Sequence, residues 1–463
     1  MTRTVGLWPT DGDREHFAKA YQGRSELSPS ARSYLEALAP AMTFPPNFRL
    51  SGERFAALQK NDPINLEVVI ALAQNWIRVD RVADALTLLE PLAQTSDAPG
   101  VVLQLLAVAY ALIDNVDASR HTLRRCLVNF VGSSNCATFL ARIELMEGQC
   151  AAAEQILRQE IETNPNDAEA YFQLANARES QGASIQEIAS ALNKGAELRD
   201  GAPGGQSALS AADFTLAVHE GRFNDALALS DKHESRLQSS NDAWEHYYAA
   251  LHSTYVRVEL GMPAEAREAV DRFVANRTEF FVNHHSYVGD NSTVLNGLAA
   301  QWQLISWTEW AAIRDTRLRR HISRDDLVHG RQRAWLELYA VPATTSVAAK
   351  EALAVLPEYA PILSRTQRWA NEDAAVGRVY WLTGSPTMAL PYFERASAAC
   401  TRLDNPVQHT QMLTQYGALL EDIGQKERAC EVYRRVLHYW PRVAESTTAT
   451  RAASRAAAVC PRL

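Results

Sequence analysis

The sequence predicts an all-α fold, a right-handed α-α superhelix built from stacked helix pairs. A leucine followed by an alanine recurs with a fixed period of about 34 residues, at Leu38, Leu72, Leu106, Leu140 and Leu174. A fixed period of this length is typical of a helical solenoid, because one helix pair cannot bury its apolar face without a neighbour. Strand-like alternation of apolar and polar residues is absent, which disfavours a sheet domain.

The length and composition fit such an elongated array. The chain has 463 residues, more than the roughly 250 to 300 residues at which single hydrophobic cores stop growing. Hydrophobic residues make up 47% of the chain and charged residues 22%, which is enough apolar side chain to fold. The formal net charge of -8 argues against a general binder of nucleic-acid backbones.

The N-terminal array, residues 31–200, shows the unit most clearly. Pro165 and Asp167 mark the end of one unit and the N-cap of the next, and Tyr171 and Leu174 follow at helical spacing. Gly148 and Gly182, separated by the same period, fall where the turn between the two helices needs positive φ. Small residues such as Ala85 and Ala153 are expected where the paired helices cross.

The later units have a longer period of about 40 residues and are less regular. The C-terminal units, residues 346–441, carry Gly377, Tyr380, Gly384, Ala389, Phe393 and Ala396, and then Gly417, Gly424, Ala429 and Tyr433. Gly221 and Gly261 indicate degenerate repeats over residues 206–275. The remaining segments are an N-terminal segment (1–30), an irregular helical section (276–345) and a capping helix or tail (442–463).

This pattern resembles the tetratricopeptide repeat, in which each unit is a pair of antiparallel helices. The C-terminal residues, from Ala389 to Cys400 and from Cys430 to Leu437, are further similar to the repeat regions that follow the kinase domain in myxobacterial serine/threonine kinases. That resemblance implies a docking role in bacterial signalling. It implies no phosphoryl transfer and no functional residue, because the kinase motifs are absent here.

No motif predicts catalysis, a cofactor or a metal site, so a non-enzymatic role is expected. The phosphate-binding, nucleophile-elbow and zinc-protease spacings do not occur. His284, His285 and Asp290 could together ligate a metal, but adjacent histidines on a helix point about 100° apart. An enzyme with an unrecognised site in the irregular section 276–345 remains an alternative.

A superhelix offers a concave groove lined by the first helix of each unit. The residues expected to line it mix apolar and polar side chains, which fits an extended or helical segment of a protein partner better than a peptide's terminal carboxylates. These residues are Ile70, Gln74, Gln104, Val108, Thr138, Arg142, Phe172, Asn176 and Glu179.

A basic run in the irregular section offers a second contact surface, made of Arg314, Arg317, Arg319, Arg320 and Arg324. A solvated helix face is the simpler interpretation. The alternatives are contact with an acidic peptide, or a regulator that binds nucleic acid through this run. Trp302, Trp307 and Trp310 lie just before it and are expected to pack in the core.

The six cysteines are far apart and form no CxxC pair, so they are expected to be reduced thiols. No stretch of 18 uncharged apolar residues occurs, and the first residues do not resemble a secretory signal. These observations predict a cytoplasmic protein with no membrane segment.

Overall fold

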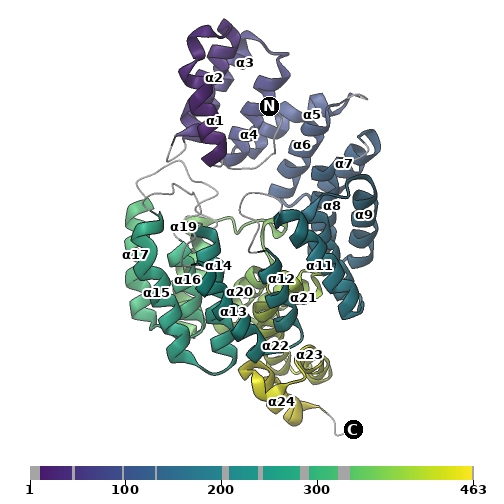
Figure 1. Ribbon diagram of the computed structural model, residues 1–463, viewed down its shortest axis with the longest axis vertical. Coiled ribbons are helices and arrows are strands. Elements are labelled where there is room, and N and C mark those ends of the chain that lie inside the picture. Colours follow the sequence, from purple (N-terminus) through teal and green to yellow (C-terminus); the bar gives the residue numbers. More distant parts are fainter. Residues whose placement is uncertain are drawn as a thin grey trace.

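The computed structural model describes residues 11–43, 47–95, 98–130, 133–200, 208–237, 243–281, 291–321 and 334–460. Within these ranges the regular elements are helices, and no strand occurs. Figure 1 shows the helices stacked side by side along the chain, with α1–α4 at one end of the molecule and α24 at the other. The predicted helical solenoid of tetratricopeptide-like units is therefore the observed fold.

The α-helices have the following bounds: α1 Asp11–Gln22, α2 Pro29–Met42, α3 Phe48–Asn61, α4 Leu66–Arg78, α5 Val82–Ala93, α6 Gly100–Leu112, α7 Val116–Asn129, α8 Ser134–Met146, α9 Cys150–Thr163, α10 Ala168–Ser180, α11 Ile185–Asp200, α12 Ala208–His219, α13 Phe223–Leu237, α14 Ala243–Glu259, α15 Pro263–Phe281, α16 Asn291–Gln301, α17 Trp307–His321, α19 Ser346–Tyr359, α20 Ala370–Leu382, α21 Pro386–Ala398, α22 Pro406–Asp422, α23 Lys426–Tyr439 and α24 Thr447–Val459. The short helices of the described chain are a π-helix, η3 (Leu336–Ala340), and four 3₁₀ turns, η1 (Arg24–Glu26), η4 (Arg365–Gln367), η5 (Arg402–Asp404) and η6 (Val443–Glu445).

One turn geometry joins the two helices in nine pairs of the described chain. The turn residue has a φ between 60° and 84° and is Asp80, Asp114, Gly148, Gly182, Gly221, Gly261, Gln303, Gly384 or Gly424. In each pair the next residue donates its N–H to the carbonyl five residues back, over 2.7 to 3.0 Å. This is the Schellman cap, which satisfies carbonyls at the end of the first helix.

Three of these turn residues, Asp80, Asp114 and Gln303, are not glycine, so a search of the sequence for glycine does not find them. Asp80 and Asp114 precede Gly148 at equal spacing along the chain, and an aspartate tolerates the left-handed conformation better than most residues. Gln303 is the next turn residue of this kind after Gly261 and joins α16 to α17. The section 276–345, expected to be irregular, thus contains a helix pair with the common turn.

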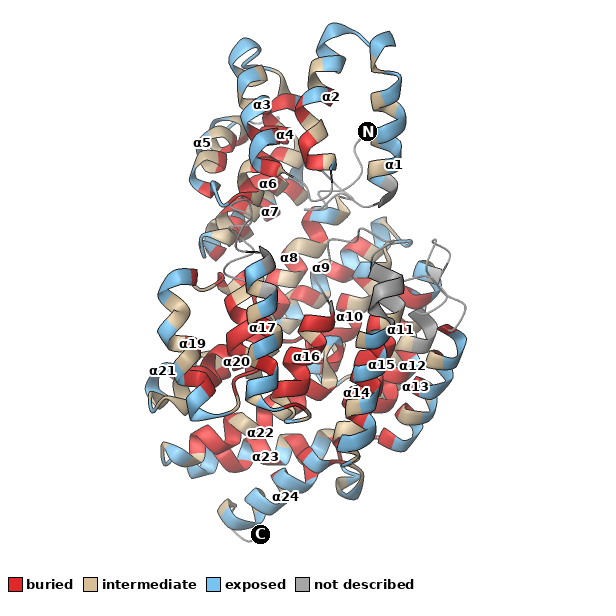
Figure 2. Cartoon of the chain, turned by 90° about the vertical axis from the view of Figure 1, so that its left-hand side faces the viewer, coloured by how far each residue is buried: buried red, intermediate tan, exposed pale blue. Residues whose placement is uncertain are grey.

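Small residues allow the helices of a pair to cross closely, as the sequence predicted. Ala85, Ala153, Ala226, Ala266, Ala389 and Ala429 are all fully buried near the start of their second helices. Gly377 and Gly417 lie against the rings of Phe393 and Tyr433, where an added Cβ would come within 3.0 and 2.5 Å of ring carbons. Figure 2 shows the resulting buried stripes running through the stacked helices.

The chain then folds back on itself. Residues 363–460, the C-terminal block, pack against one edge of the earlier units, the row of turns from Asp114 to Gly261 that we call the turn edge. In chain order, Thr366 donates to the carbonyl of Ala111, Cys400 donates its N–H to the carbonyl of Leu145, and Trp440 donates to the carbonyl of Val218. The C-terminal block therefore covers successive units of the solenoid.

A buried carboxylate fixes the last helix to this edge. Glu259, at the end of α14, has no exposed surface and accepts hydrogen bonds from the main-chain N–H of Thr448 (3.1 Å) and the hydroxyl of Ser446 (2.7 Å). The negative charge thus sits at the N-terminus of α24, where the helix dipole is favourable. The side chain of Gln411 donates a further bond to it over 2.7 Å.

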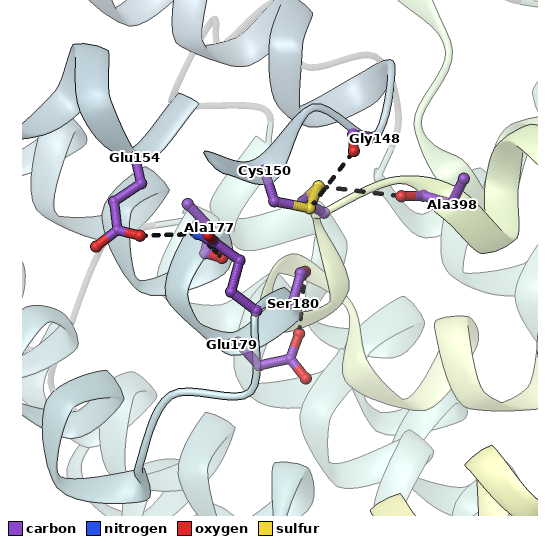
Figure 3. The surroundings of a disulfide bond; sticks show 9 residues. Gly148, Cys150, Glu154, Ala177, Glu179, Ser180 and Ala398 are labelled. Atoms are coloured by element: carbon purple, nitrogen blue, oxygen red, sulfur yellow. Dashed lines mark hydrogen bonds between the residues drawn. A yellow bond between two sulfur atoms is a disulfide. The ribbon is translucent and has the colours of Figure 1, made fainter. Parts of the chain in front are cut away.

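The prediction of reduced cysteines is wrong. The six cysteines form three disulfides, Cys126–Cys136, Cys150–Cys400 and Cys430–Cys460, and none is free. Figure 3 shows Cys150 bonded to the segment that follows α21, beside Gly148 and Ala398. Sequence spacing missed the Cys150–Cys400 pair because these residues are 250 positions apart and meet only when the C-terminal block folds back.

No helix of the described chain is long and apolar enough to span a membrane.

Two glycines with the same left-handed turn should respond differently to alanine. Gly424→Ala meets no atom within 4 Å and should cost about 1 to 2 kcal/mol of unfolding free energy from backbone strain alone. Gly221→Ala places its Cβ 3.1 Å from the Cα of Trp440 and should cost about 3 kcal/mol or more. Urea unfolding of both variants measures the difference, and equal losses would contradict the packing of Trp440 on this turn.

Candidate functional site

The first helices of five units can be compared at one position, on the face predicted to line the groove. Gln74, Val108, Arg142, Asn176 and Arg378 each lie six residues before the left-handed turn residue of their unit. They occupy the last turns of α4, α6, α8, α10 and α20, the first helix of each pair. Three of these five residues contact another segment of the same chain.

Asn176 holds the 3₁₀ turn η5 through one main-chain group and one side-chain group. Its side-chain oxygen accepts the N–H of Leu403 over 2.9 Å, and its amide nitrogen donates to the carboxylate of Asp404 over 2.7 Å. The side chain is buried, with 3% of its surface exposed. At this unit the position predicted to bind a partner therefore binds the chain's own segment.

Arg378 makes the equivalent contact with main-chain carbonyls. It donates to the carbonyls of Val341 (2.6 Å) and Ala343 (2.7 Å), and to the side chain of Gln415 (3.2 Å). Burial lowers the pKa of this arginine to about 10. These three partners are neutral, so the guanidinium is stabilised by hydrogen bonds to oxygen dipoles.

Arg142 is the third case. Its guanidinium lies over the ring of Trp369, 4.3 Å from the centroid, in a cation–π contact. Trp369 is the N-cap residue of α20 and follows the segment that crosses the ends of α6 and α8, where Arg365 donates its N–H to Asp114 over 2.8 Å. The predicted groove residue thus meets the C-terminal block.

Glu179, one turn after Asn176, is also engaged within the chain. Its carboxylate pairs with Arg402 over 2.7 Å, and their side chains are 4% and 2% exposed. The Arg402 guanidinium also lies 3.7 Å from the ring centroid of Tyr439 and bonds the ring of His219. Burial, and then the charge of Arg402, lower the pKa of His219 to about 3.

The other predicted groove residues lie on the same helices with fewer partners. The ring centroid of Phe172 lies 4.4 Å from the guanidinium carbon of Arg199. The hydroxyl of Thr138 donates a hydrogen bond to the carbonyl of Ser134. Ile70 and Val108 are half-buried and pack on the core of the N-terminal array. Gln74 and Gln104 are half-buried on α4 and α6, and within the described chain their side chains have no hydrogen-bond partner.

The predicted basic patch is only partly a surface feature. Arg314 is buried, pairs with Glu351 over 2.7 Å and lies 4.6 Å from the ring centroid of Tyr339, so it is not an exposed contact residue. Arg319 is exposed and donates to Thr316. The side chains of Arg317 and Arg320, and all of Arg324, lie outside the described residues.

The three tryptophans beside this run pack inside, as predicted. Trp310 has no exposed surface and donates its ring N–H to the carbonyl of Leu338 over 3.2 Å. Trp302 and Trp307 are half-buried and donate theirs to Gln411 and Glu351. Each ring thereby links the α16–α17 pair to a later helix.

Sequence reasoning missed a pocket between three neighbouring helices. It has a volume of about 540 Å³ and lies between α9, α10 and α11. Tyr171, Leu174 and Ile161 line it, with charged side chains such as Lys194 and Glu162 around them. Sequence patterns carry no signal for it, because the pocket joins three helices whose residues are ordinary repeat positions.

The described ranges do not bring together the side chains that a metal site needs. No group of three or more histidine, cysteine, aspartate or glutamate side chains is placed to hold an ion there. His284, His285 and Asp290 lie in 282–290, outside the described residues.

No known protein family matches the chain, and no curated protein does. Among solved structures, MamA matches with a TM-score of 0.30 and 19% identity, over 33% of this chain and 90% of that one. Naa15/Naa10 bound to HypK-THB matches with a TM-score of 0.27 and 12% identity, over 92% and 64%. The P58(IPK) TPR domain matches with a TM-score of 0.23 and 13% identity, over 86% and 99%. These chains are similar to parts of this one, and the fold assignment rests on its own repeated helix pairs and turns.

Breaking the buried ion pair should be costly. Arg402→Met leaves the Glu179 carboxylate buried without its cation and should lower the free energy of unfolding by about 3 to 5 kcal/mol. The control Arg442→Met removes a half-exposed pair with Glu445 (3.4 Å) and should cost less than about 1 kcal/mol. Chemical denaturation of both variants compares them, and similar small losses would contradict the role given to Arg402.

The neutral His219 predicts an acid-sensitive fold. Its pKa is about 3 in the folded chain and about 6.5 in the unfolded chain, so below pH 6.5 the unfolded state takes up a proton that the folded state does not. Stability from this residue is therefore present above pH 6.5 and is lost as the pH falls. The difference in free energy of unfolding between His219→Gln and the wild type should move in favour of the variant by about 2 kcal/mol when the pH is lowered from 7 to 5. Denaturant unfolding at both values tests this, and a pH-independent difference would refute it.

Proposed function

We propose that this protein is a non-catalytic scaffold whose N-terminal array binds an extended segment of a partner protein on its inner face. The site consists of Ile70, Gln74, Gln104, Val108 and Thr138, on α4, α6 and α8. Ile70 and Val108 would give apolar contacts, and the two glutamines would bond the main chain of the segment.

The observation that carries this proposal is the use of the same position inside the molecule. Asn176 accepts a main-chain N–H, and Arg378 donates to main-chain carbonyls, each six residues before its turn. Gln74 stands at that position in the α4–α5 unit and has an amide that can both donate and accept. Recognition of main-chain groups supplies affinity with little dependence on the partner's sequence.

The position of the array supports the proposal further. Figure 1 shows α1–α4 at the end of the molecule opposite to α24, the last helix of the C-terminal block. The first turn for which we find a contact from the C-terminal block is Asp114, one unit later than Asp80.

The finer roles follow the resemblance noted in the sequence. Similarity to the repeat regions of myxobacterial kinases extends the proposal to docking in bacterial signalling, with a protein as the partner. Nucleic acid is a weaker candidate, because Arg314 of the basic run is buried. A cytoplasmic location is not part of the proposal, since the argument from reduced cysteines is wrong.

The test uses full-length protein and a library of random twelve-residue peptides. A selected peptide should bind wild-type protein and lose about fivefold to a hundredfold in affinity in the double variant Gln74→Ala with Gln104→Ala, since two hydrogen bonds are removed. The matched control is Gln155→Ala with Gln186→Ala, two exposed glutamines on the second helices α9 and α11. Calorimetric titration measures all three proteins.

A peptide methylated at its main-chain nitrogens sharpens the result. Methylation removes the N–H groups that would donate hydrogen bonds to the glutamine oxygens. The affinity of the wild-type protein for the peptide should therefore fall, while the affinity of the double variant should change little. Failure to select any peptide, or equal affinities for the wild type and the double variant, would refute the proposed site.

A further inference from the structure

The disulfides follow a simple order along the chain. The first cysteine is bonded to the second, the third to the fourth and the fifth to the sixth: Cys126–Cys136, Cys150–Cys400 and Cys430–Cys460. Six cysteines allow 15 complete pairings, and this is the one that results when each thiol reacts with the next to be synthesised. Such pairing needs no later exchange between bonds.

We infer that this protein is matured by thiol oxidation in an oxidising compartment, by consecutive pairing, and that the Cys150–Cys400 bond locks the C-terminal block onto the turn edge. Cytosolic thiols are kept reduced, whereas three disulfides with no free cysteine are typical of proteins that fold outside the cytosol. Each bond forms as two thiols lose two protons and two electrons. The disulfide of a thiol–disulfide oxidoreductase takes these up and leaves as a dithiol.

The position of the long-range bond gives it its locking role. Cys150 begins α9, and Cys400 lies just after α21, where its N–H is bonded to the carbonyl of Leu145 over 2.8 Å. Gly148 makes room for this segment, because a Cβ there would lie 2.9 Å from the carbonyl oxygen of Ala398. The next residues carry Arg402 to Glu179 and Leu403 to Asn176. One covalent bond therefore holds the start of the segment that occupies the inner face of α10.

Burial makes this lock resistant to reduction in the folded protein. Cys400 has no exposed surface, and Cys150 is half-buried. A reductant must reach a sulfur atom to attack it, so the folded chain should keep this bond longer than an exposed one. The bond is thus placed to be permanent once the C-terminal block has docked.

The first test counts thiols in the endogenous full-length protein. Cells are quenched in acid, the protein is denatured and alkylated with a maleimide, and its peptides are identified by mass spectrometry. No cysteine should be alkylated, and the three consecutive pairs should appear as linked peptides. Six alkylated cysteines, or a different pairing, would overturn the inference.

The second test measures the lock by trypsin cleavage after Arg402, which is buried. Cleavage should be at least tenfold faster in Cys150→Ser with Cys400→Ser than in wild type. It should change little in the control Cys430→Ser with Cys460→Ser, whose bond lies within the C-terminal block. If the first variant does not fold, folded wild-type protein that has been reduced until mass spectrometry shows Cys150 and Cys400 as thiols should give the same acceleration. Unchanged cleavage of protein in which these two thiols are free would refute the locking role. Neither test involves peptide binding, so the outcome is separate from that of the proposed function.

Discussion

The buried ion pair between Arg402 and Glu179 is the interaction on which the closed arrangement of this solenoid depends. An open superhelix needs contacts only between neighbouring units, but here two side chains 223 residues apart are removed from water together. An unpaired guanidinium at this depth would be very costly, so the C-terminal block can dock only where Glu179 receives it. Tyr439 and His219 complete the surroundings of Arg402 and bring α23 and α12 to the same point.

The same inner position therefore has two roles along the chain. At Asn176 and Arg378 it secures segments of the protein itself, whereas at Gln74 it carries an amide with no bonded partner in the described chain. The intramolecular contacts are examples of what the repeat recognises, namely main-chain N–H and carbonyl groups of an irregular segment. This is why the proposed binding mode relies on hydrogen bonds to the main chain of the partner segment.

The sequence predicted the parts of the fold that depend on neighbouring residues. The period of leucine and alanine predicted the helix pairs, and Gly148, Gly182, Gly221 and Gly261 predicted their turns, because each follows from local geometry. Asp80, Asp114 and Gln303 take the same turn conformation without being glycine. Because Gln303 forms the turn of the helix pair within 276–345, the sequence of that section showed no glycine where the turn lies. Arg314 looked exposed in a basic run because its partner, Glu351, is far away in sequence. The occupied state of the inner face, at Arg142, Asn176 and Glu179, depends on residues of the distant C-terminal block and could not be read from spacing.

The covering of the turn edge has a mechanical consequence. A solenoid of stacked repeats can normally bend and twist, because each unit contacts only its neighbours and can rotate slightly relative to the next unit. Here the C-terminal block bridges the turns from Asp114 to Gly261, so those rotations are tied together and this part of the molecule acts as a rigid frame. The units before Asp114 keep the freedom of an ordinary solenoid, so the molecule joins a stiff base to a compliant arm. Such an arm can change its curvature to fit a bound partner segment, while the orientation of the rigid base stays the same.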